Sequence, residues 1–432
     1  MRINLNYGKT GMGVDVPDSW TPDFLRKTAM PVLDAPERAV ETALDTPVDG
    51  RGLTEMAGGA RSACIAICDI TRPVPNGLIL PPIVRRLLDG GMKAEDITIL
   101  VATGLHRPNE GEELREIVGD DWVFETVRTV NHFGQNDEDH VDLGWTPRGT
   151  HVRIDHRFVN ADIRIVVGLV EPHFMAGYSG GRKLIAPGCA HKETITTFHN
   201  AEFMEHPKAT SCVLDGNPLH EEQLEIVRLV GGALAVNTVI DEERRLSFVN
   251  FGEIVSSHLD AVAYTRAYSE IRPPRRYKTV LTSAAGYPLD KTYYQTVKGM
   301  AVPVEIVAPG GDLIIVADCS EGMGSDAYVD AQRRYVKNGI DGFMAEIQKK
   351  SHAGIDEWQT EMQIRIQRVG TVMLYSEGLP EADWPLTGVE RIDSVEAALK
   401  ASVEKHGDTN IAVIPEGPYV VPLFGREPEQ AA

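Results

Sequence analysis

The sequence predicts an α/β protein with mostly parallel sheets, and three features of the chain lead to this prediction. Short apolar runs rich in β-branched residues alternate with segments whose apolar residues recur at helical spacing. The mostly apolar run 163–170 leads into a glycine-rich stretch at 177–181, as in a strand-to-helix turn. The 432 residues exceed one ordinary core, so we expect two α/β domains with a ligand cleft between them.

The periodicity of the sequence assigns the individual elements. Apolar, β-branched runs predict strands at 62–68, 97–102, 163–169, 279–282, 313–317, 371–375 and 411–414. Helical spacing predicts helices at 81–89, 192–199, 219–229, 251–266, 291–301, 327–349 and 394–406. Residues 1–7 have a strand-like pattern without the apolar core of a signal peptide.

The best domain boundary is the charged, proline-containing segment 272–276, which separates a predicted helix from a new strand. It divides the chain into an N-terminal domain, residues 1–270, which holds the glycine-rich stretch, and a C-terminal α/β domain, residues 275–432. A return of the last ~20 residues to the N-terminal domain is left open.

The composition limits the classes of partner. The formal net charge is −20 and the isoelectric point is near 5.1, which argues against nucleic acid and anionic membranes as partners. No apolar run has the length of a membrane helix. Five cysteines without a Cys-x-x-Cys pair fit a reducing compartment, so we expect a cytoplasmic protein. We expect its ligand to be a small molecule, since the charge argues against nucleic acid and membranes.

Polar residues follow the ends of two predicted strands near the N-terminus. After strand 62–68 come Asp69 and Arg72, and the planar guanidinium of Arg72 suits a carboxylate or a phosphate. Asp69 either orients Arg72 or holds a sugar hydroxyl group. The alternative for this motif is an ordinary ion pair in a surface turn. His106 follows strand 97–102, where an imidazole can act as acid and base or be merely structural.

The third group follows strand 163–169 and contains His173, the glycine-rich loop and Lys183. Gly177, Ser179, Gly180 and Gly181 would let backbone N–H groups approach an anion, with help from the N-terminus of the next helix. The spacing matches neither the P-loop nor the dinucleotide-binding pattern. Lys183 is suited either to pair with a phosphate or to bond covalently to an acyl group of a cofactor.

His199 closes the helix predicted after this loop and is a candidate ligand for nickel, copper, zinc or iron. No Cys or second His stands at ligand spacing around it, so a metal here must take most of its ligands from elsewhere. The alternative is a helix-surface or capping imidazole.

The last group lies in the C-terminal part. Positions 291, 294, 295 and 298 share one face of a predicted helix, which places Tyr294, Gln295 and Lys298 together. This face either lines a cleft or is an ordinary solvated surface. Trp358 either covers a small apolar group or belongs to the core.

Taken together, these motifs resemble the lactate racemase family that uses a nickel-pincer nucleotide. The matching pieces occur in family order along residues 69–298: Asp-x-Thr-Arg-Pro at 69–73, Ala-Thr-Gly-Leu-His-Arg at 102–107, Glu-Pro-His at 171–173 through Lys183, Thr-x-His-Asn at 197–200 and Tyr-Tyr-Gln-x-x-Lys at 293–298. Each piece is weak by itself, whereas the combination is specific.

The resemblance implies a role for each position. The N-terminal domain would bind the cofactor and carry out catalysis, and the C-terminal domain would close the cleft. The implied roles are acid and base for His106 and His173, nucleotide attachment for Lys183, and the protein ligand to nickel for His199. Substrate contacts are implied for Arg72, Tyr294, Gln295, Lys298 and Trp358, and support of the nucleotide for Asp69, Gly177, Ser179, Gly180 and Gly181.

The implied activity is racemisation or epimerisation of a small, lactate-like 2-hydroxy acid through a 2-keto acid. Removing an α-proton beside a carboxylate is difficult, whereas hydride can leave if the hydroxyl proton leaves with it and a cofactor accepts the hydride. Proteins of cofactor synthesis are then expected partners. Two other classes stay open: a nicotinamide-dependent 2-hydroxy acid dehydrogenase, and a non-catalytic protein that binds the cofactor or another ligand. The sequence leaves the particular hydroxy acid and the oligomeric state undetermined.

Overall fold

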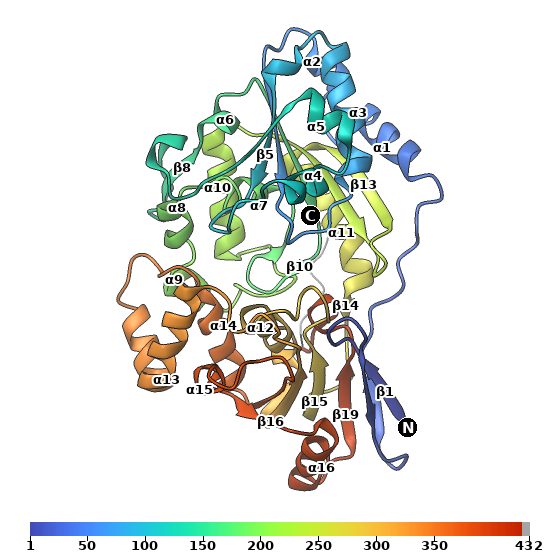
Figure 1. Cartoon of the computed structure of the whole chain (residues 1–432), viewed down its shortest axis with the longest axis vertical. Coiled ribbons are helices and arrows are strands. Elements are labelled where there is room, and N and C mark those ends of the chain that lie inside the picture. The colour runs from blue at the N-terminus through green and yellow to red at the C-terminus, as the bar shows by residue number, and fades with distance from the viewer. Residues whose placement is uncertain (426–432) are drawn as a thin grey trace. The chain divides into compact units, whose positions relative to one another are not determined.

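The computed structural model describes residues 1–425 as two compact α/β units (Figure 1). The N-terminal unit comprises Ala29–Phe198 and Lys208–Ala267. Its sheet has the order β13-β12-β9-β4-β5-β6 and is parallel except for β13, which runs antiparallel to β12. The strands are β4 (Ala63–Cys68), β5 (Ile97–Ala102), β6 (Arg128–Asn131), β9 (Ile163–Leu169), β12 (Leu234–Ile240) and β13 (Leu246–Glu253).

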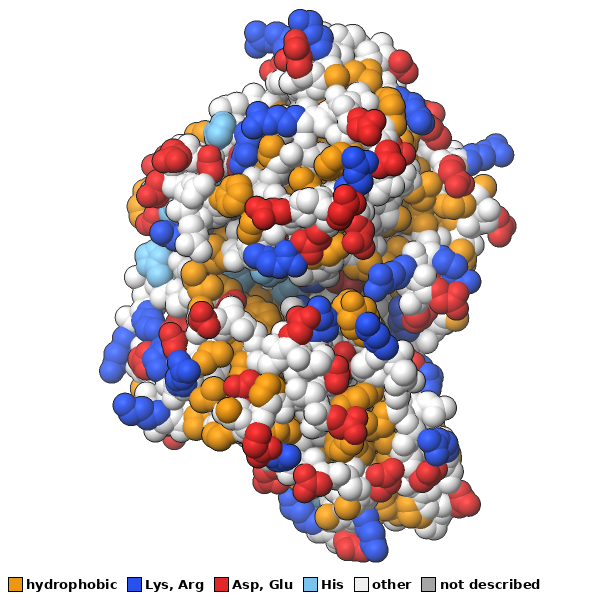
Figure 2. All heavy atoms as spheres, in the orientation of Figure 1, with side chains coloured by type: hydrophobic (Ala, Val, Ile, Leu, Met, Phe, Trp, Pro, Cys, Tyr) orange, Lys and Arg blue, Asp and Glu red, His pale blue; other side chains and the backbone are white. Residues whose placement is uncertain are grey.

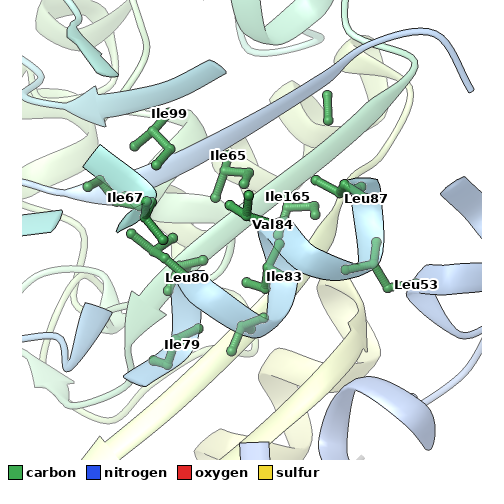
Figure 3. Close-up of a cluster of buried hydrophobic side chains, with 14 of the residues drawn as sticks. Leu53, Ile65, Ile67, Ile79, Leu80, Ile83, Val84, Leu87, Ile99 and Ile165 are labelled. Atoms are coloured by element: carbon green, nitrogen blue, oxygen red, sulfur yellow. The ribbon is translucent and has the colours of Figure 1, made fainter. Parts of the chain in front are cut away.

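The core of this unit lies between the sheet and helix α3 (Asn76–Asp89). Ile65 and Ile67 of β4 are fully buried with Ile99 of β5 against Ile83 of α3 (Figure 3). The intervening residue Ala66 is buried as well, as expected of a parallel strand that is covered on both faces. Two short helices also contact β4, namely α6 (His156–Val159) and α7 (Arg182–Ile185).

The C-terminal unit comprises Met1–Thr28, His199–Pro207 and the described residues from Tyr268 onward. Its sheet is parallel throughout and has the order β18-β17-β16-β15-β19-β3. The strands are β3 (Thr21–Phe24), β15 (Tyr277–Ser283), β16 (Val307–Val316), β17 (Thr371–Tyr375), β18 (Glu390–Arg391) and β19 (Asn410–Ile414). The main helices are α12 (Tyr293–Ala301), α13 (Asp326–Ile347), α14 (Glu357–Gln367) and α16 (Val395–His406).

The predicted α/β class with mostly parallel sheets is confirmed, and every predicted strand is present. Several predicted helix boundaries were wrong by two or more residues. Helix α3 begins at Asn76 rather than 81, because Pro81 and Pro82 lie inside it. Helix α11 spans Ile254–Ser269, since residues 251–253 belong to β13. Helix α8 spans Lys192–Thr197, so His199 lies beyond its end.

The chain crosses between the two units more often than one boundary near 270 implies. That boundary coincides with the crossing between Ala267 and Tyr268. The first 28 residues nevertheless belong to the C-terminal unit, where β3 pairs with β19 and β1 (Arg2–Leu5) contributes Ile3 and Leu5 to the core. The strand β20 (Val421–Pro422) pairs with β14 (Glu270–Ile271), and both lie in the C-terminal unit.

The surface mixes both signs of charge despite the net charge of −20. On the face shown in Figure 2, acidic and basic side chains alternate rather than form one large patch of a single sign. Within residues 1–425, no helix combines the length and the apolar character needed to traverse a bilayer.

Candidate active site

The predicted polar groups of the N-terminal unit meet where the strand order of its sheet reverses. From β4 the chain proceeds to β5 and β6 on one side, and later returns to form β9 on the other side of β4. The segments after the carboxyl ends of β4 and β9 therefore diverge, and in open α/β sheets ligands bind at such a point. Asp69 and Arg72 follow β4, His106 follows β5, and Glu171 and His173 follow β9.

Asp69 and His106 form a hydrogen-bonded pair across two of these loops. The Nδ1 atom of His106 lies 2.6 Å from Oδ2 of Asp69. The other carboxylate oxygen of Asp69 accepts hydrogen bonds from the backbone N–H and the hydroxyl group of Thr71, at 3.1 Å and 2.5 Å. Burial raises the pKa of Asp69, but the bonds from His106 and Thr71 and the charge of Arg72 outweigh it and lower the pKa overall. Asp69 is therefore an ionised group that orients His106.

Arg72 links the loop after β4 to the loop after β9. Its Nε atom lies 3.2 Å from Oε1 of Glu171, and both side chains are about one-quarter exposed, at 26% each. Arg72 also donates from Nη1 to the carbonyl oxygen of Thr71 at 3.2 Å. These bonds hold the guanidinium beside Asp69 and His106, where it can bind the carboxylate of a small acid.

His173 lies in a two-stranded ribbon that β10 (Pro172–His173) forms with β11 (Gly177–Tyr178). Its Nδ1 atom accepts hydrogen bonds from the backbone N–H groups of Ala176 and Met175, at 3.2 Å and 3.4 Å. The ring stacks on Phe174, with 5.1 Å between centroids. His173 is thus held by its own turn, whereas His106 is held by a carboxylate from a neighbouring loop.

The glycines of the loop are required by close backbone packing. All three have positive φ, with +77° at Gly177, +78° at Gly180 and +48° at Gly181. A Cβ atom at Gly177 would lie 2.2 Å from the carbonyl oxygen of Val213, and one at Gly181 would lie 3.0 Å from the ring of His258. This packing explains the glycines without any ligand. The glycine-rich turn is the feature that favours a nicotinamide-dependent dehydrogenase, so this packing weakens that alternative.

Ser179 is committed to the same framework. Its hydroxyl group donates to the carbonyl oxygen of Leu169 at 2.7 Å and accepts from the backbone N–H of Glu171 at 3.0 Å. The predicted contact of Ser179 with a nucleotide stays a prediction, and its observed bonds join the loop to the end of β9.

Lys183 lies in the single turn of α7 (Arg182–Ile185), which precedes the helix predicted at 192–199 and is too short to contribute a strong dipole to the loop. Its backbone is fixed by bonds from Lys183 N–H to the Gly180 carbonyl and from Gly188 N–H to the Lys183 carbonyl, both 3.1 Å. The side chain is half-buried. This rigid backbone and partial burial suit a lysine that anchors a ligand.

Arg182 is a buried cation that the sequence analysis did not single out. It is 2% exposed and donates to the carbonyl oxygens of Ala176 and Tyr178, at 2.9 Å and 3.1 Å. Its Nη1 atom lies 3.0 Å from Nε2 of His258, and burial lowers the pKa of Arg182 to about 9. Arg182 therefore braces the turn that carries His173 from inside the protein.

The remaining predicted residues lie in the C-terminal unit. His199 is 5% exposed and lies before α9 (Ala201–Met204), with its ring centroid 4.9 Å from that of Trp358 in α14. The contact brings together two residues that belong to separate motifs of the sequence. Tyr294, Gln295 and Lys298 all lie on α12, whose N-cap is Thr292, and Lys291 lies just before the helix. The carbonyl oxygen of Tyr294 accepts a bond from Gln359 of α14 at 2.6 Å.

Two observations bear on a bound metal or cofactor. Among residues 1–425, no cluster of three or more His, Cys, Asp or Glu side chains is arranged to hold a metal ion. A metal at His199 would therefore need ligands from a cofactor. The Oε1 atom of Gln295 is buried without a hydrogen-bond partner in the described part of the chain, as expected of a group that faces a ligand. These residues fit a group that brings its own donor atoms.

Two functional features were missed in the sequence. Glu171, the partner of Arg72, stands two residues before His173, and its position at a strand end could have indicated it. The brace between Arg182 and His258 joins positions 76 apart and leaves no local pattern.

Comparison with known proteins places these elements in one family. The model of the lactate racemase N-terminal domain matches residues 7–212, and that of the lactate racemase C-terminal domain matches residues 274–421. The lactate racemase of Thermoanaerobacterium thermosaccharolyticum is 31% identical over 428 residues, which cover 97% of this chain and 98% of that protein. The chain belongs to the lactate racemase family.

Further relatives agree with this assignment. The lactate racemase of Lactiplantibacillus plantarum is 30% identical over 392 residues, covering 89% of this chain and 90% of that protein. The solved structure of the lactate racemase apoprotein from T. thermosaccharolyticum matches with a TM-score of 0.90 at 28% identity, over 99% of this chain and 100% of that one. A Thermotoga maritima protein shares the fold at a TM-score of 0.68 and 18% identity, over 90% of this chain and 98% of that one. The resemblance stated from the motifs is thus confirmed, and the chain is an isomerase of the racemase type.

Proposed function

We propose that this chain racemises a small 2-hydroxy acid, with lactate as the first candidate. The observation that carries the proposal is the linkage of three strand-end loops at the reversal of the sheet: Asp69 to His106, and Arg72 to Glu171. It supplies an oriented imidazole next to a guanidinium, which suits an acid with a carboxylate beside a hydroxyl group. The names of the relatives support lactate as the substrate.

Each residue then has a definite task. Arg72 binds the carboxylate, so that both enantiomers share one anchor. His106, held by Asp69, takes the hydroxyl proton on one side, and His173 performs the proton transfer on the other side. We further assign substrate positioning to Tyr294, Gln295, Lys298 and Trp358, and support of the nucleotide to Asp69, Gly177, Ser179, Gly180 and Gly181.

The cofactor in this proposal is a nickel-pincer nucleotide joined to Lys183, with His199 as the protein ligand to nickel. When bound, it would supply the electrophile that takes and returns the hydride of the α-carbon, through a 2-keto acid. The half-buried side chain of Lys183, on a backbone fixed by hydrogen bonds to Gly180 and Gly188, supports such an attachment. Proteins that make this nucleotide are then partners of the chain, and we propose the cytoplasm as its location.

The test combines intact mass with chiral product analysis. The full chain, expressed together with a cofactor-synthesis pathway, should carry an adduct and convert either enantiomer of lactate to the racemate. Lys183→Ala should lose the adduct and the activity, and Lys192→Ala, an exposed lysine on α8, is the matched control that should keep both. A chain loaded with nickel that is inert on every 2-hydroxy acid in a substrate screen contradicts the proposal. Net formation of a keto acid with reduction of free NAD would favour the dehydrogenase instead.

A further inference from the structure

The two histidines of the proposed site have different hydrogen-bond environments, and the difference fixes where each carries its proton. The inference rests on the proposed function, because it concerns the two groups assigned there as acid and base. It adds a resting protonation pattern and a coupling to the turn that carries His173.

His106 is bound to an acceptor. The atom next to its Nδ1 is a carboxylate oxygen of Asp69, at 2.6 Å, and the side chain of Asp69 is only 7% exposed. An ionised carboxylate accepts hydrogen bonds and cannot donate one, so Nδ1 of His106 carries a hydrogen. In the neutral ring, Nε2 then holds a lone pair. That atom belongs to a side chain that is 55% exposed, and it is the one able to accept a proton.

His173 is bound to donors. The backbone N–H groups of Ala176 and Met175 both point to its Nδ1, at 3.2 Å and 3.4 Å. A backbone N–H can only donate, so Nδ1 of His173 holds a lone pair and the hydrogen of the neutral ring lies on Nε2. A hydrogen on Nδ1 would face both of these N–H groups, so the turn favours the tautomer with the hydrogen on Nε2.

The turn around His173 is braced and resists rearrangement. His173 pairs with Gly177 in the β10–β11 ribbon. The buried guanidinium of Arg182 donates to the carbonyl oxygens of Ala176 and Tyr178, on either side of Gly177. The donors to Nδ1 are therefore held by the interior of the protein.

We propose that the resting chain holds its two imidazoles in opposite tautomers, with His106 set to accept a proton at Nε2 and His173 set to donate a hydrogen bond from Nε2. The enantiomer whose hydroxyl group faces His106 then finds a base ready, and its proton moves from the hydroxyl oxygen to Nε2 of His106. His173 can give up its Nε2 proton only after Nδ1 has taken a proton from a hydronium ion of the solvent, which leaves water and breaks the bonds from Ala176 and Met175. Proton transfer by His173 is thus coupled to opening of the turn, whereas proton transfer by His106 is not. Asp69 and Arg182 act as positioning residues.

Nitrogen-15 NMR of the full chain labelled at histidine tests this directly, because the two tautomers of a neutral ring give different ring-nitrogen shifts. His106→Gln and His173→Gln identify the two rings by loss of their signals. The proposal expects the proton on Nδ1 in His106 and on Nε2 in His173. The same tautomer in both rings, or a proton on Nδ1 of His173 at neutral pH, overturns it.

Two variants test whether Asp69 sets the tautomer of His106. In Asp69→Asn the amide can donate to Nδ1, so a majority of His106 should shift to the tautomer with the proton on Nε2, while His173 stays unchanged. Thr71→Val removes a bond to the other oxygen of Asp69 and should leave both tautomers as they are. An unshifted His106 in Asp69→Asn overturns the role of Asp69.

This measurement needs no cofactor and separates the two proposals. Opposite tautomers in a chain that racemises nothing would refute the proposed function and leave the assignment of the protons intact. Racemisation by a chain with identical tautomers would support the proposed function and refute the assignment of the protons.

Discussion

In the proposed reaction, Asp69 acts by orienting the ring of His106, to which it is hydrogen-bonded. Three bonds converge on its carboxylate, from His106 and from the backbone and hydroxyl group of Thr71. These partners and Arg72 lower its pKa despite burial, so Asp69 stays ionised at neutral pH. The carboxylate thereby selects the tautomer of His106 in which Nε2 is able to accept a proton.

The substitution Asp69→Asn should reduce kcat much more than it raises KM. The amide keeps the shape of the side chain but permits the wrong tautomer of His106, and in hydrolases with a comparable pair this costs roughly 10⁴-fold in kcat. We expect a loss of at least about 100-fold, since the pair here is more open to water. Thr71→Val is the control and should lose less than about tenfold. Steady-state rates on both enantiomers decide the matter, and equal losses in the two variants would argue that Asp69 only holds the loop together.

The glycines at 177–181 suggest a binding motif in the sequence, but close backbone packing accounts for them. The loop must pass close to the segment around Val213 and to His258, and only glycine leaves room there. The glycines that drew attention to this loop in the sequence serve packing in the structure. The loop positions His173 and Lys183, and its glycines make that position possible.

Gly177→Ala and Gly149→Ala separate packing from backbone strain. Both positions have similar positive φ, +77° and +83°, so both variants incur about 1–2 kcal/mol of strain. A Cβ at 177 would also collide with the carbonyl oxygen of Val213, whereas nothing lies within 4 Å of one at 149. We expect Gly177→Ala to lower the free energy of unfolding by more than about 3 kcal/mol and Gly149→Ala by about 1–2 kcal/mol. Urea unfolding measures both, and similar losses would show that the packing at 177 relaxes readily.

Helix α14 depends on buried polar groups. Gln363 is fully buried and accepts bonds at Oε1 from the Tyr293 hydroxyl group and the Gln332 amide, at 3.0 Å and 2.9 Å. Its own amide donates to the carbonyl oxygen of Thr387 at 2.7 Å. Gln363 thus joins three other parts of the C-terminal unit.

Gln363→Leu should destabilise the C-terminal unit by roughly 2–4 kcal/mol, because several buried groups lose their partner at once. Gln367→Leu, one turn later on the same helix and partly exposed, should cost less than about 1 kcal/mol, since water can replace its bonds. Thermal unfolding of the two variants in parallel gives the comparison. If Gln363→Leu is as stable as the control, the network contributes specificity rather than stability.

Helix α14 and strand β12 were not predicted from the sequence, because both contain polar residues that are buried. Helix α14 escaped detection because Gln359, Thr360, Glu361 and Gln363 are buried, so polarity and exposure do not coincide along it. Strand β12 escaped because Asn237 interrupts its apolar run, although Asn237 is buried and bonded to Asn250 of β13 at 3.0 Å. Strands β4, β5 and β9 were found because their apolar residues are contiguous. The contact between Arg182 and His258 could not be predicted, because the two residues are 76 positions apart in the sequence.

The order of segments along the chain does not follow the division into two units. Residues 1–28 and 199–207 belong with the C-terminal unit, so His199 and Lys183 lie in different units although they are 16 positions apart. A local sequence window cannot reveal this, because the pairing of β3 with β19 joins residues almost 390 positions apart.

The stability of the chain should fall on mild acidification, and two buried imidazoles of the N-terminal unit give the reason. Burial and the charge of Arg182 lower the pKa of His258 to about 3, and burial with the charges of Arg182 and His258 lowers that of His220 to about 2. In the unfolded chain both titrate near 6.5. Below that pH the unfolded state binds protons that the folded state does not, so the free energy of unfolding decreases by up to about 1.4 kcal/mol per pH unit for each ring.

Urea unfolding from pH 7 down to about 5 should therefore show a stability that is nearly flat above about 6.5 and falls below it. His220→Phe removes one of the two titrating rings, so the slope below about 6.5 should become smaller by about 1.4 kcal/mol per pH unit, whatever the variant does to the stability at neutral pH. His352→Phe alters an exposed ring and should leave the slope unchanged. A slope that is equal in all three proteins would mean that His220 takes up protons in the folded state and that the cluster around Arg182 is open to water.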